Sequence, residues 1–221
     1  MLTVLYSVKG GQGCSVTTGL LALSGDPNIV AVDATGDLAL VLGVNDAHLV
    51  GLTEALLHDG PVGQLPIEHL PSGPDFVAVG QAELTDITDQ QWHDLAERLA
   101  DDDRHYIVDT GTGPARTMTA AADECLLVTR YCFLAFRATI RTRLRRDGVI
   151  GIVEPGRPLG RSDAERVIGA SIVLELPYAP EISRAVDAGL LFVERLPAIA
   201  RRALRQRDPA WADNSDDRTA T

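Results

Sequence analysis

The segment Lys9-Gly10-Gly11-Gln12-Gly13-Cys14-Ser15 constrains the fold of this 221-residue chain more than any other. It follows a strand-like apolar run, Leu2–Val8, and precedes a helical stretch, Ser15–Leu23. Glycines let the backbone turn so tightly that several N–H groups face one point, and the N-terminus of the next helix adds partial positive charge there. The segment therefore predicts a phosphate-binding turn; the alternative is a structural strand–helix turn without a ligand.

Strand-like and helical stretches alternate along the chain, which is typical of a parallel sheet built from strand–helix units. The predicted strands are Leu2–Val8, Ile29–Asp33, Phe76–Val79, His105–Asp109, Cys125–Thr129, Val149–Val153 and Ser171–Leu174. The predicted helices are Ser15–Leu23, Thr53–Leu57, Asp89–Ala100 (with Asp86 or Thr88 as cap), Ala115–Ala122, Leu134–Arg146, Ser162–Ile168, Pro180–Ala188 and Leu196–Arg207. Wholly apolar runs such as Ile29–Val32 indicate strands covered on both faces. The predicted fold is α/β: a doubly wound, mainly parallel sheet of about seven strands with helices on both faces.

The chain shows no repeat of fixed period and no internal linker, so residues 1–207 are expected to form one domain. Residues 208–221 are polar and acidic with almost no apolar periodicity. Such a composition cannot bury enough apolar surface to fold, so this tail is predicted to be disordered.

Composition excludes several protein classes. No apolar run approaches 18 residues, so no transmembrane segment is expected. Met1–Val8 has neither a preceding basic segment nor a following small-residue cleavage site, which argues against a signal peptide. Three cysteines (Cys14, Cys125 and Cys132) form no disulfide framework, and Cys125 and Cys132 are predicted to be core residues. A cytoplasmic location is predicted.

The charge is distributed unevenly. Residues 1–109 contain 17 acidic residues against three basic ones, whereas residues 110–221 contain 14 acidic residues and 17 arginines. Two clusters hold many of these arginines: Arg137, Arg141, Arg143, Arg145 and Arg146, and then Arg195, Arg201, Arg202, Arg205 and Arg207. Arg137, Arg141 and Arg145 are expected on one helix face, as are Arg201 and Arg205. Such faces can bind DNA phosphates without sequence preference, but a solvated face paired with nearby acids is the favoured interpretation.

The glycine loop resembles the deviant Walker A motif, K-G-G-x-G-K-[ST]-[ST], of the ParA/MinD family of P-loop ATPases. The resemblance extends roughly from Leu2 to Leu204. Asp33 lies where the family's switch I begins, and Asp109-Thr110-Gly111-Thr112-Gly113 is similar to the D-x-x-x-G of switch II. Leu176-Pro177-Tyr178 resembles the segment that flanks adenine in relatives, and Gly36–Gly43 is similar to the pilus-assembly branch of ParA-like proteins.

The resemblance implies a P-loop NTPase type of fold, ATP or ADP with Mg²⁺ as cofactor, and a homodimer that sandwiches two nucleotides. It implies that Lys9 reaches phosphate across the dimer and that Asp33 takes part in catalysis at switch I. It assigns Mg²⁺ to Ser15 and Asp109, and the γ-phosphate to the N–H of Gly113. The nucleotide-binding residues that it implies are Lys9, Gly10, Gly11, Gln12, Gly13, Cys14, Ser15, Val16, Gly113 and Pro177.

Four positions depart from the family pattern. The second Walker A lysine is Cys14, and the hydroxyl residue after Ser15 is Val16. The second carboxylate of the switch I D-x-D is Thr35, and the asparagine that contacts adenine in many relatives is Glu154. Phosphoryl transfer depends on placed positive charge and an oriented nucleophile, so these changes predict weakened ATP binding and little or no hydrolysis.

The sequence thus favours a ParA/MinD-like positioning or partitioning protein with an unidentified protein partner. One alternative is a pseudo-ATPase scaffold that binds protein partners without nucleotide. Another is a competent ATPase in which Arg116, Arg130 or Asp37 replaces a missing group. Cys14 is interpreted as a small residue tolerated after loss of the lysine, rather than as a nucleophile. Asp33 and Asp109 can alternatively cap the turns that follow them, and the five histidines have no metal-ligand spacing.

Overall fold

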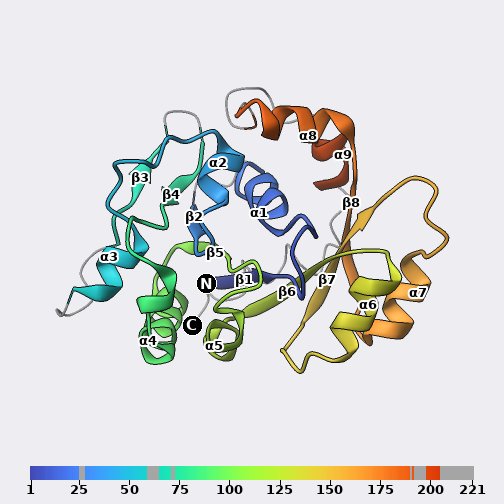
Figure 1. The fold of residues 1–221 in the computed structure, drawn as a ribbon, viewed down its shortest axis with the longest axis horizontal. Coiled ribbons are helices and arrows are strands. Elements are labelled where there is room, and N and C mark those ends of the chain that lie inside the picture. The colour runs from blue at the N-terminus through green and yellow to red at the C-terminus, as the bar shows by residue number, and fades with distance from the viewer. Residues whose placement is uncertain (25–27, 59–64, 71–72, 190, 192–197, 205–221) are drawn as a thin grey trace.

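The fold is described from a computed structural model, which defines residues 1–24, 28–58, 65–70, 73–189, 191 and 198–204. Within this part of the chain, eight strands form one sheet in the order β3-β4-β2-β5-β1-β6-β7-β8 (Figure 1). Their bounds are β1 Leu2–Tyr6, β2 Ile29–Asp33, β3 Glu68–His69, β4 Asp75–Val77, β5 His105–Asp109, β6 Glu124–Arg130, β7 Gly148–Val153 and β8 Ile172–Pro177. Neighbouring strands are parallel except β3 and β4. The predicted doubly wound, mainly parallel sheet is confirmed.

The additional strand, β3, is a two-residue antiparallel edge strand. It pairs Glu68 with Phe76 and His69 with Asp75. The His69 ring also lies 2.6 Å from the Asp75 carboxylate. Two residues are too few to show an alternating pattern, so the sequence contains no strand signal here.

Helices cover both faces of the sheet, as predicted (Figure 1). On one face lie α1, α2, α8 and α9, and on the other lie α4, α5, α6 and α7. Their bounds, with α3 and a short 3₁₀ turn η1, are α1 Cys14–Ala22, α2 Leu38–Leu42, α3 Leu52–Leu57, η1 Leu84–Asp86, α4 Asp89–Asp101, α5 Ala115–Ala121, α6 Phe133–Ile140, α7 Arg161–Ile168, α8 Pro180–Asp187 and α9 Ala198–Leu204. The alternating strand β1 separates the two cores: Val4 and Tyr6 pack with α4, and Leu5 packs with α1.

The start of α4 follows from a local sequence signal. The Thr88 hydroxyl accepts a hydrogen bond from the Gln91 N–H at 3.3 Å, and the Gln91 side chain accepts one from the Thr88 N–H at 2.9 Å. This reciprocal pair is a capping box, so Thr88, one of the two predicted caps, begins α4.

The prediction of one helix over Leu134–Arg146 is wrong. Helix α6 ends at Ile140, and Arg145 lies in the connection to β7. There the Arg145 guanidinium donates to the Ala122 and Asp123 carbonyls at 2.7 and 3.1 Å and pairs with Asp147. Arg145 therefore does not extend the helix face that carries Arg137, because tertiary hydrogen bonds to the neighbouring connection outweigh helix propensity.

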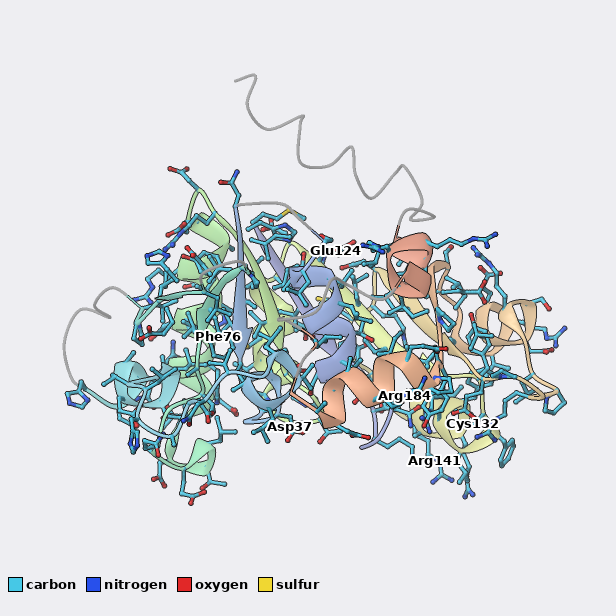
Figure 2. All side chains as sticks on the ribbon, turned by 90° about the horizontal axis from the view of Figure 1, so that it is seen from above. Asp37, Phe76, Glu124, Cys132, Arg141 and Arg184 are labelled. Atoms are coloured by element: carbon cyan, nitrogen blue, oxygen red, sulfur yellow. The ribbon has the colours of Figure 1, made fainter. Side chains whose placement is uncertain are left out.

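The carboxyl ends of the parallel strands share one edge of the sheet. Figure 2 shows this directly: Glu124, where β6 begins, lies in the upper part of the view, whereas Cys132, just after β6, lies at the lower edge. Asp37, which follows β2, also lies along the lower edge in that view. Ligands of doubly wound folds bind at this edge, so the predicted site residues were sought there.

Three further predictions concern residues that lie outside the described part of the chain. The domain boundary at 207/208 and the acidic tail lie outside them, as do Arg195, Arg205 and Arg207.

All three cysteines are free; Cys125 is buried in the core, but Cys132 is only half-buried, at the start of α6. Among the described helices, none is long and apolar enough to cross a bilayer.

Candidate functional site

The glycine loop joins β1 to α1 at the carboxyl edge of the sheet. Gly11 and Gly13 have φ angles of 72° and 88°, in the left-handed region that favours glycine. Gly13 is the residue before α1, and its carbonyl accepts the first helical hydrogen bond, from Thr17, at 2.9 Å. The loop is also tied to β6, since the buried Gln12 side chain accepts from the Arg130 N–H at 3.1 Å. The positive φ angles at two glycines explain why the local sequence must be glycine-rich.

Asp109, at the end of β5, lies beneath this loop. Its carboxylate interacts by hydrogen bonds with the side chains of Ser15 and Cys14, and it accepts the Gly111 N–H at 3.1 Å and the Thr35 hydroxyl at 3.3 Å. The side chain is fully buried, and this desolvation raises its pKa to about 6. The structure thus brings together Ser15 and Asp109, the two residues to which the family resemblance assigns Mg²⁺.

Cys14 occupies the first turn of α1 and is nearly fully buried. Burial, with the neighbouring Asp109 carboxylate as a further cause, raises the pKa of the Cys14 thiol well above its ordinary value. A thiol with a raised pKa carries little thiolate at neutral pH and is a poor nucleophile. The geometry therefore favours the interpretation of Cys14 as a packed, neutral residue.

Asp33, at the end of β2, is fully buried and pairs in register with Asp109. Its Oδ1 accepts the Thr35 N–H (2.9 Å), the Thr35 hydroxyl (2.9 Å) and the Gly36 N–H (2.8 Å). Its Oδ2 accepts the N–H groups of Leu38 and Ala39 at 3.1 and 3.2 Å. These five bonds hold the turn into α2, a helix that the sequence analysis missed. Asp33 thus caps the turn that follows it, which was the alternative to a catalytic role. The catalytic role of Asp33 stays a prediction.

A cavity of about 480 Å³ opens in front of the loop. The loop residues Gly10, Gly11, Gln12, Cys14 and Ser15 line it, together with Thr35, Asp37 and the segment Thr110–Pro114. Another wall, which sequence reasoning missed, comes from η1, α4 and the residues between them: Leu84, Thr85, Ile87, Asp89 and Trp92. No local motif marks these residues, because they reach the site only through the packing of α4 beside α5. Among the described residues that line the cavity, none is a lysine or an arginine.

Two other predicted residues have partners within their own segments. The ammonium group of Lys9 lies 3.3 Å from the Gly10 carbonyl in an exposed position. The Gly113 N–H donates to the Thr110 carbonyl at 2.8 Å. Contact of Gly113 with a γ-phosphate would therefore require this turn to open.

A second cavity, of about 230 Å³, lies on the other side of Gln12. Four of the predicted nucleotide-binding residues line it: Gln12, Gly13, Val16 and Pro177. Most of its lining is aliphatic, from Leu20, Ile152, Leu176, Ala179, Ile182 and Val186. A small, largely apolar space of this kind suits a flat ring system.

Arg130 is a cationic residue in the wall of this second cavity. Its guanidinium lies 4.7 Å from the centre of the Tyr178 ring, and its Nε lies 3.0 Å from Glu154. Glu154 also pairs with Arg157 at 2.6 Å, so two arginines share its carboxylate. Glu154, placed by the resemblance where relatives contact adenine, is absent from the lining of the cavity.

The described residues contain no cluster of side chains typical of a site for a metal other than magnesium. They contain no group of three or more His, Cys, Asp and Glu side chains that could hold a metal ion. Mg²⁺ differs in this respect, because it keeps several waters and is held by one or two protein oxygens together with substrate phosphates. Ser15 and Asp109 supply such oxygens, so the residues present fit this ion.

Comparisons with known proteins agree on the fold. No protein-family model and no curated protein matches the sequence. Among solved structures, the septum site-determining protein MinD of Pyrococcus horikoshii, complexed with Mg-ADP, is 19% identical with a TM-score of 0.76, covering 99% of this chain and 97% of its own. A ParA family ATPase from Chlorobium tepidum is 20% identical with a TM-score of 0.70, covering 92% and 95%. An ATP complex of a substituted McdA from Cyanothece is 16% identical with a TM-score of 0.71, covering 97% and 96%.

The fold is that of the ParA/MinD ATPases. The resemblance inferred from the glycine loop is thereby confirmed at the level of the fold. In this ParA/MinD-like fold the loop, Asp33 and Asp109 lie together at the carboxyl edge. Which of these residues bind a ligand stays a prediction.

Proposed function

We propose that the protein is a ParA/MinD-like positioning or partitioning protein that binds a magnesium nucleotide weakly and hydrolyses it slowly or not at all. The observation that carries the proposal is the cavity at the glycine loop, which is lined by the loop backbone but by no lysine or arginine among the described residues. The buried Cys14 side chain stands where the resembled motif has its second lysine. Loss of one charged phosphate contact weakens binding by roughly 1.5–3 kcal/mol, or about ten- to a hundred-fold.

In this proposal the backbone N–H groups of the loop and the N-terminus of α1 bind the phosphates. Ser15 and Asp109 hold Mg²⁺, which supplies charge neutralisation on the phosphate oxygens. Asp109 would hold the ion as its carboxylate, which a pKa of about 6 makes the main form at neutral pH. The base lies in the second cavity, against Val16 and Pro177, and Lys9 contacts phosphate across a homodimer.

Weak hydrolysis follows from the positions of the carboxylates. Asp33 already accepts five hydrogen bonds, so it has little capacity left to orient water. Thr35, at the position of the second switch I carboxylate, shares its one hydroxyl proton between Asp33 at 2.9 Å and Asp109 at 3.3 Å. Asp37 lines the cavity and is the remaining carboxylate near switch I that faces it.

Calorimetric titration with Mg²⁺-ATP and Mg²⁺-ADP tests the proposal. Binding in the micromolar to sub-millimolar range is expected, and Lys9→Ala is expected to weaken ATP binding. Cys14→Lys is expected to tighten binding by about ten- to a hundred-fold, by restoring the charged contact. Absence of heat at millimolar nucleotide, with the protein folded, would overturn the proposal.

The second candidate is a pseudo-ATPase scaffold that works through protein partners. The hydrogen bonds of Cys14, Ser15 and Thr35 to Asp109 favour it, because they give this carboxylate protein partners without a ligand. A third candidate, a competent ATPase, needs a substitute cation. Arg130 belongs to the second cavity, and Arg116 is exposed on α5, so abolition of measurable turnover by Arg116→Ala would favour this candidate.

The partners and location belong to the same proposal. Exposed Arg137, Arg141, Arg201 and Arg202 are the described residues through which non-specific DNA binding would occur. A protein partner of unidentified nature and a cytoplasmic location complete the proposal. Loss of DNA binding at low salt in Arg137→Gln/Arg141→Gln would assign that role to α6.

A further inference from the structure

Helix α6 presents an outward face that combines arginine with large apolar side chains. The exposed residues of this face, which we call the α6 face, are Leu134, Arg137, Ile140 and Arg141. Leu134 and Ile140 are each 62% exposed. Both lie three residues from Arg137, on opposite sides of it, and Arg141 follows Arg137 by four residues, so the four side chains are neighbours on the helix surface. Figure 2 shows Arg141 at the lower rim of the molecule, whereas the other side of α6 is buried in the core.

The two arginines of the α6 face lack acidic partners within the described part of the chain. Neither Arg137 nor Arg141 has an ion pair or a side-chain hydrogen bond there. Residues 125–146 contain no Asp or Glu. On α7, which packs beside α6, Asp163 and Glu165 pair with arginines of their own helix. The α6 face therefore carries uncompensated positive charge next to exposed apolar surface.

This combination favours one class of partner. Non-specific DNA binding uses arginines through the charge of the phosphates and leaves aliphatic side chains in water. A membrane surface would bury Leu134 and Ile140 together with Arg137 between them, and burial of that charge among lipid chains costs free energy. A protein segment with carboxylates between apolar residues can contact both kinds of side chain at once. Protein interfaces combine apolar anchors with arginine in this way.

We propose that the α6 face is the docking surface for an acidic helical segment of a partner protein, with two carboxylates one turn apart and an apolar residue on each side of them. The carboxylates pair with Arg137 and Arg141, and the apolar residues cover Leu134 and Ile140. Exposed ion pairs contribute little by themselves, so the apolar contacts supply most of the affinity and the charges fix the register. The inference rests on the proposed function, which includes an unidentified protein partner, and it assigns that partner's chemistry and its surface on this chain.

Peptide binding to the full chain tests the proposal. The probe is a fluorescently labelled synthetic helix with two glutamates four residues apart and a leucine three residues to each side of the first glutamate. The comparison helix has the same composition, with the glutamates moved to the opposite face. Fluorescence anisotropy is expected to show about ten-fold tighter binding of the probe than of the comparison helix. Arg137→Gln/Arg141→Gln and Leu134→Ser/Ile140→Ser are each expected to weaken probe binding by about ten-fold or more, with melting temperatures that show both variants to be folded.

Arg201→Gln/Arg202→Gln is the matched control, since these exposed arginines of α9 lie on the other side of the sheet. It is expected to keep probe binding. The inference is overturned if the probe does not bind, if both helices bind equally, or if either double variant of the α6 face binds the probe as the parent does. Binding of duplex DNA or phosphatidylglycerol vesicles through the α6 face in place of the probe would overturn it in favour of that class.

Nucleotide titration is independent of the probe and separates the inference from the proposed function. Loss of probe binding with nucleotide bound overturns the inference alone. Absence of nucleotide binding with the probe bound overturns nucleotide binding in the proposed function and leaves the docking surface standing.

Discussion

Asp109 is a buried carboxylate at the glycine loop whose pKa is strongly raised. It is fully buried next to a second buried carboxylate, Asp33, and desolvation is the main cause of its raised pKa. Three side-chain donors and one backbone N–H compensate this cost only in part. Binding of a proton or a cation to the Asp109 carboxylate would therefore stabilise the site.

A pH dependence follows from the pKa of about 6 against an unfolded value of 3.8. Because the folded pKa is the higher one, the folded state binds the proton more tightly. Protonation of Asp109 therefore contributes about 3 kcal/mol to the free energy of unfolding. This contribution is fully present below about pH 4 and is lost as the pH rises through 6. Asp109→Asn is expected to raise the free energy of unfolding relative to the parent at pH 8 but not at pH 4. Urea denaturation in EDTA measures this; an equal effect at both pH values would contradict it.

Asp33 allows a matched pair of substitutions. Asp33→Ala leaves four backbone N–H groups and the Thr35 hydroxyl without their acceptor. Since unsatisfied buried donors cost about 1–3 kcal/mol each before relaxation, we expect a loss of about 3 kcal/mol or more. Asp37→Ala removes a nearby exposed carboxylate and is expected to change the free energy of unfolding by less than about 0.5 kcal/mol. Equal effects of the two variants in denaturant titrations would refute the structural role of Asp33.

Among the elements, α6 and the connection to β7 show how an arginine-rich segment is divided. Arg137 lies in the last turn of α6 and is exposed. Arg145 instead donates to the Ala122 and Asp123 carbonyls between α5 and β6, and Arg146 donates to the Thr142 carbonyl. The segment thus contains two kinds of arginine. Some are exposed to solvent, and others, between the end of α6 and the start of β7, form hydrogen bonds to backbone carbonyls. Sequence spacing alone does not distinguish the two.

This division predicts different costs for neighbouring residues. Arg145→Ala removes two hydrogen bonds to carbonyls and a pair with Asp147, and is expected to lower the free energy of unfolding by about 1–2 kcal/mol. Arg143→Ala alters an exposed side chain and is expected to cost less than about 0.5 kcal/mol. Thermal denaturation of both variants is the measurement, and indistinguishable melting temperatures would show that the Arg145 contacts contribute nothing.

At the scale of the whole molecule, exposed apolar side chains follow the carboxyl ends of three strands. Phe133 is 68% exposed after β6, Tyr178 is 46% exposed after β8, and Leu40, in α2 after β2, is 65% exposed. The glycine loop lies at the same edge. Large exposed apolar side chains gathered at one edge are typical of an interaction surface, which is consistent with the proposed homodimer.

Sedimentation analysis tests this arrangement. With a saturating magnesium nucleoside triphosphate the protein is expected to sediment as a dimer, and Lys9→Ala as a monomer, because Lys9 is proposed to bind the partner's phosphate. Phe133→Ser serves as a comparison at the same edge and is expected to weaken the dimer without changing the affinity for nucleotide. A parent protein that remains monomeric with nucleotide bound would contradict the proposal.

The sequence by itself determined the mainly parallel sheet and the place of the glycine-rich turn after β1. Continuous apolar runs such as Ile29–Val32 and the glycines of the loop act locally, so neighbours in sequence suffice to recognise them. The end of α6 and the edge strand β3 were decided only by tertiary contacts, through Arg145 and His69. The same is true of the second cavity, where Arg130 and Tyr178 come from two different strand ends. Contacts between residues far apart in the chain leave no periodic or local pattern, and the tertiary structure alone brings these groups together.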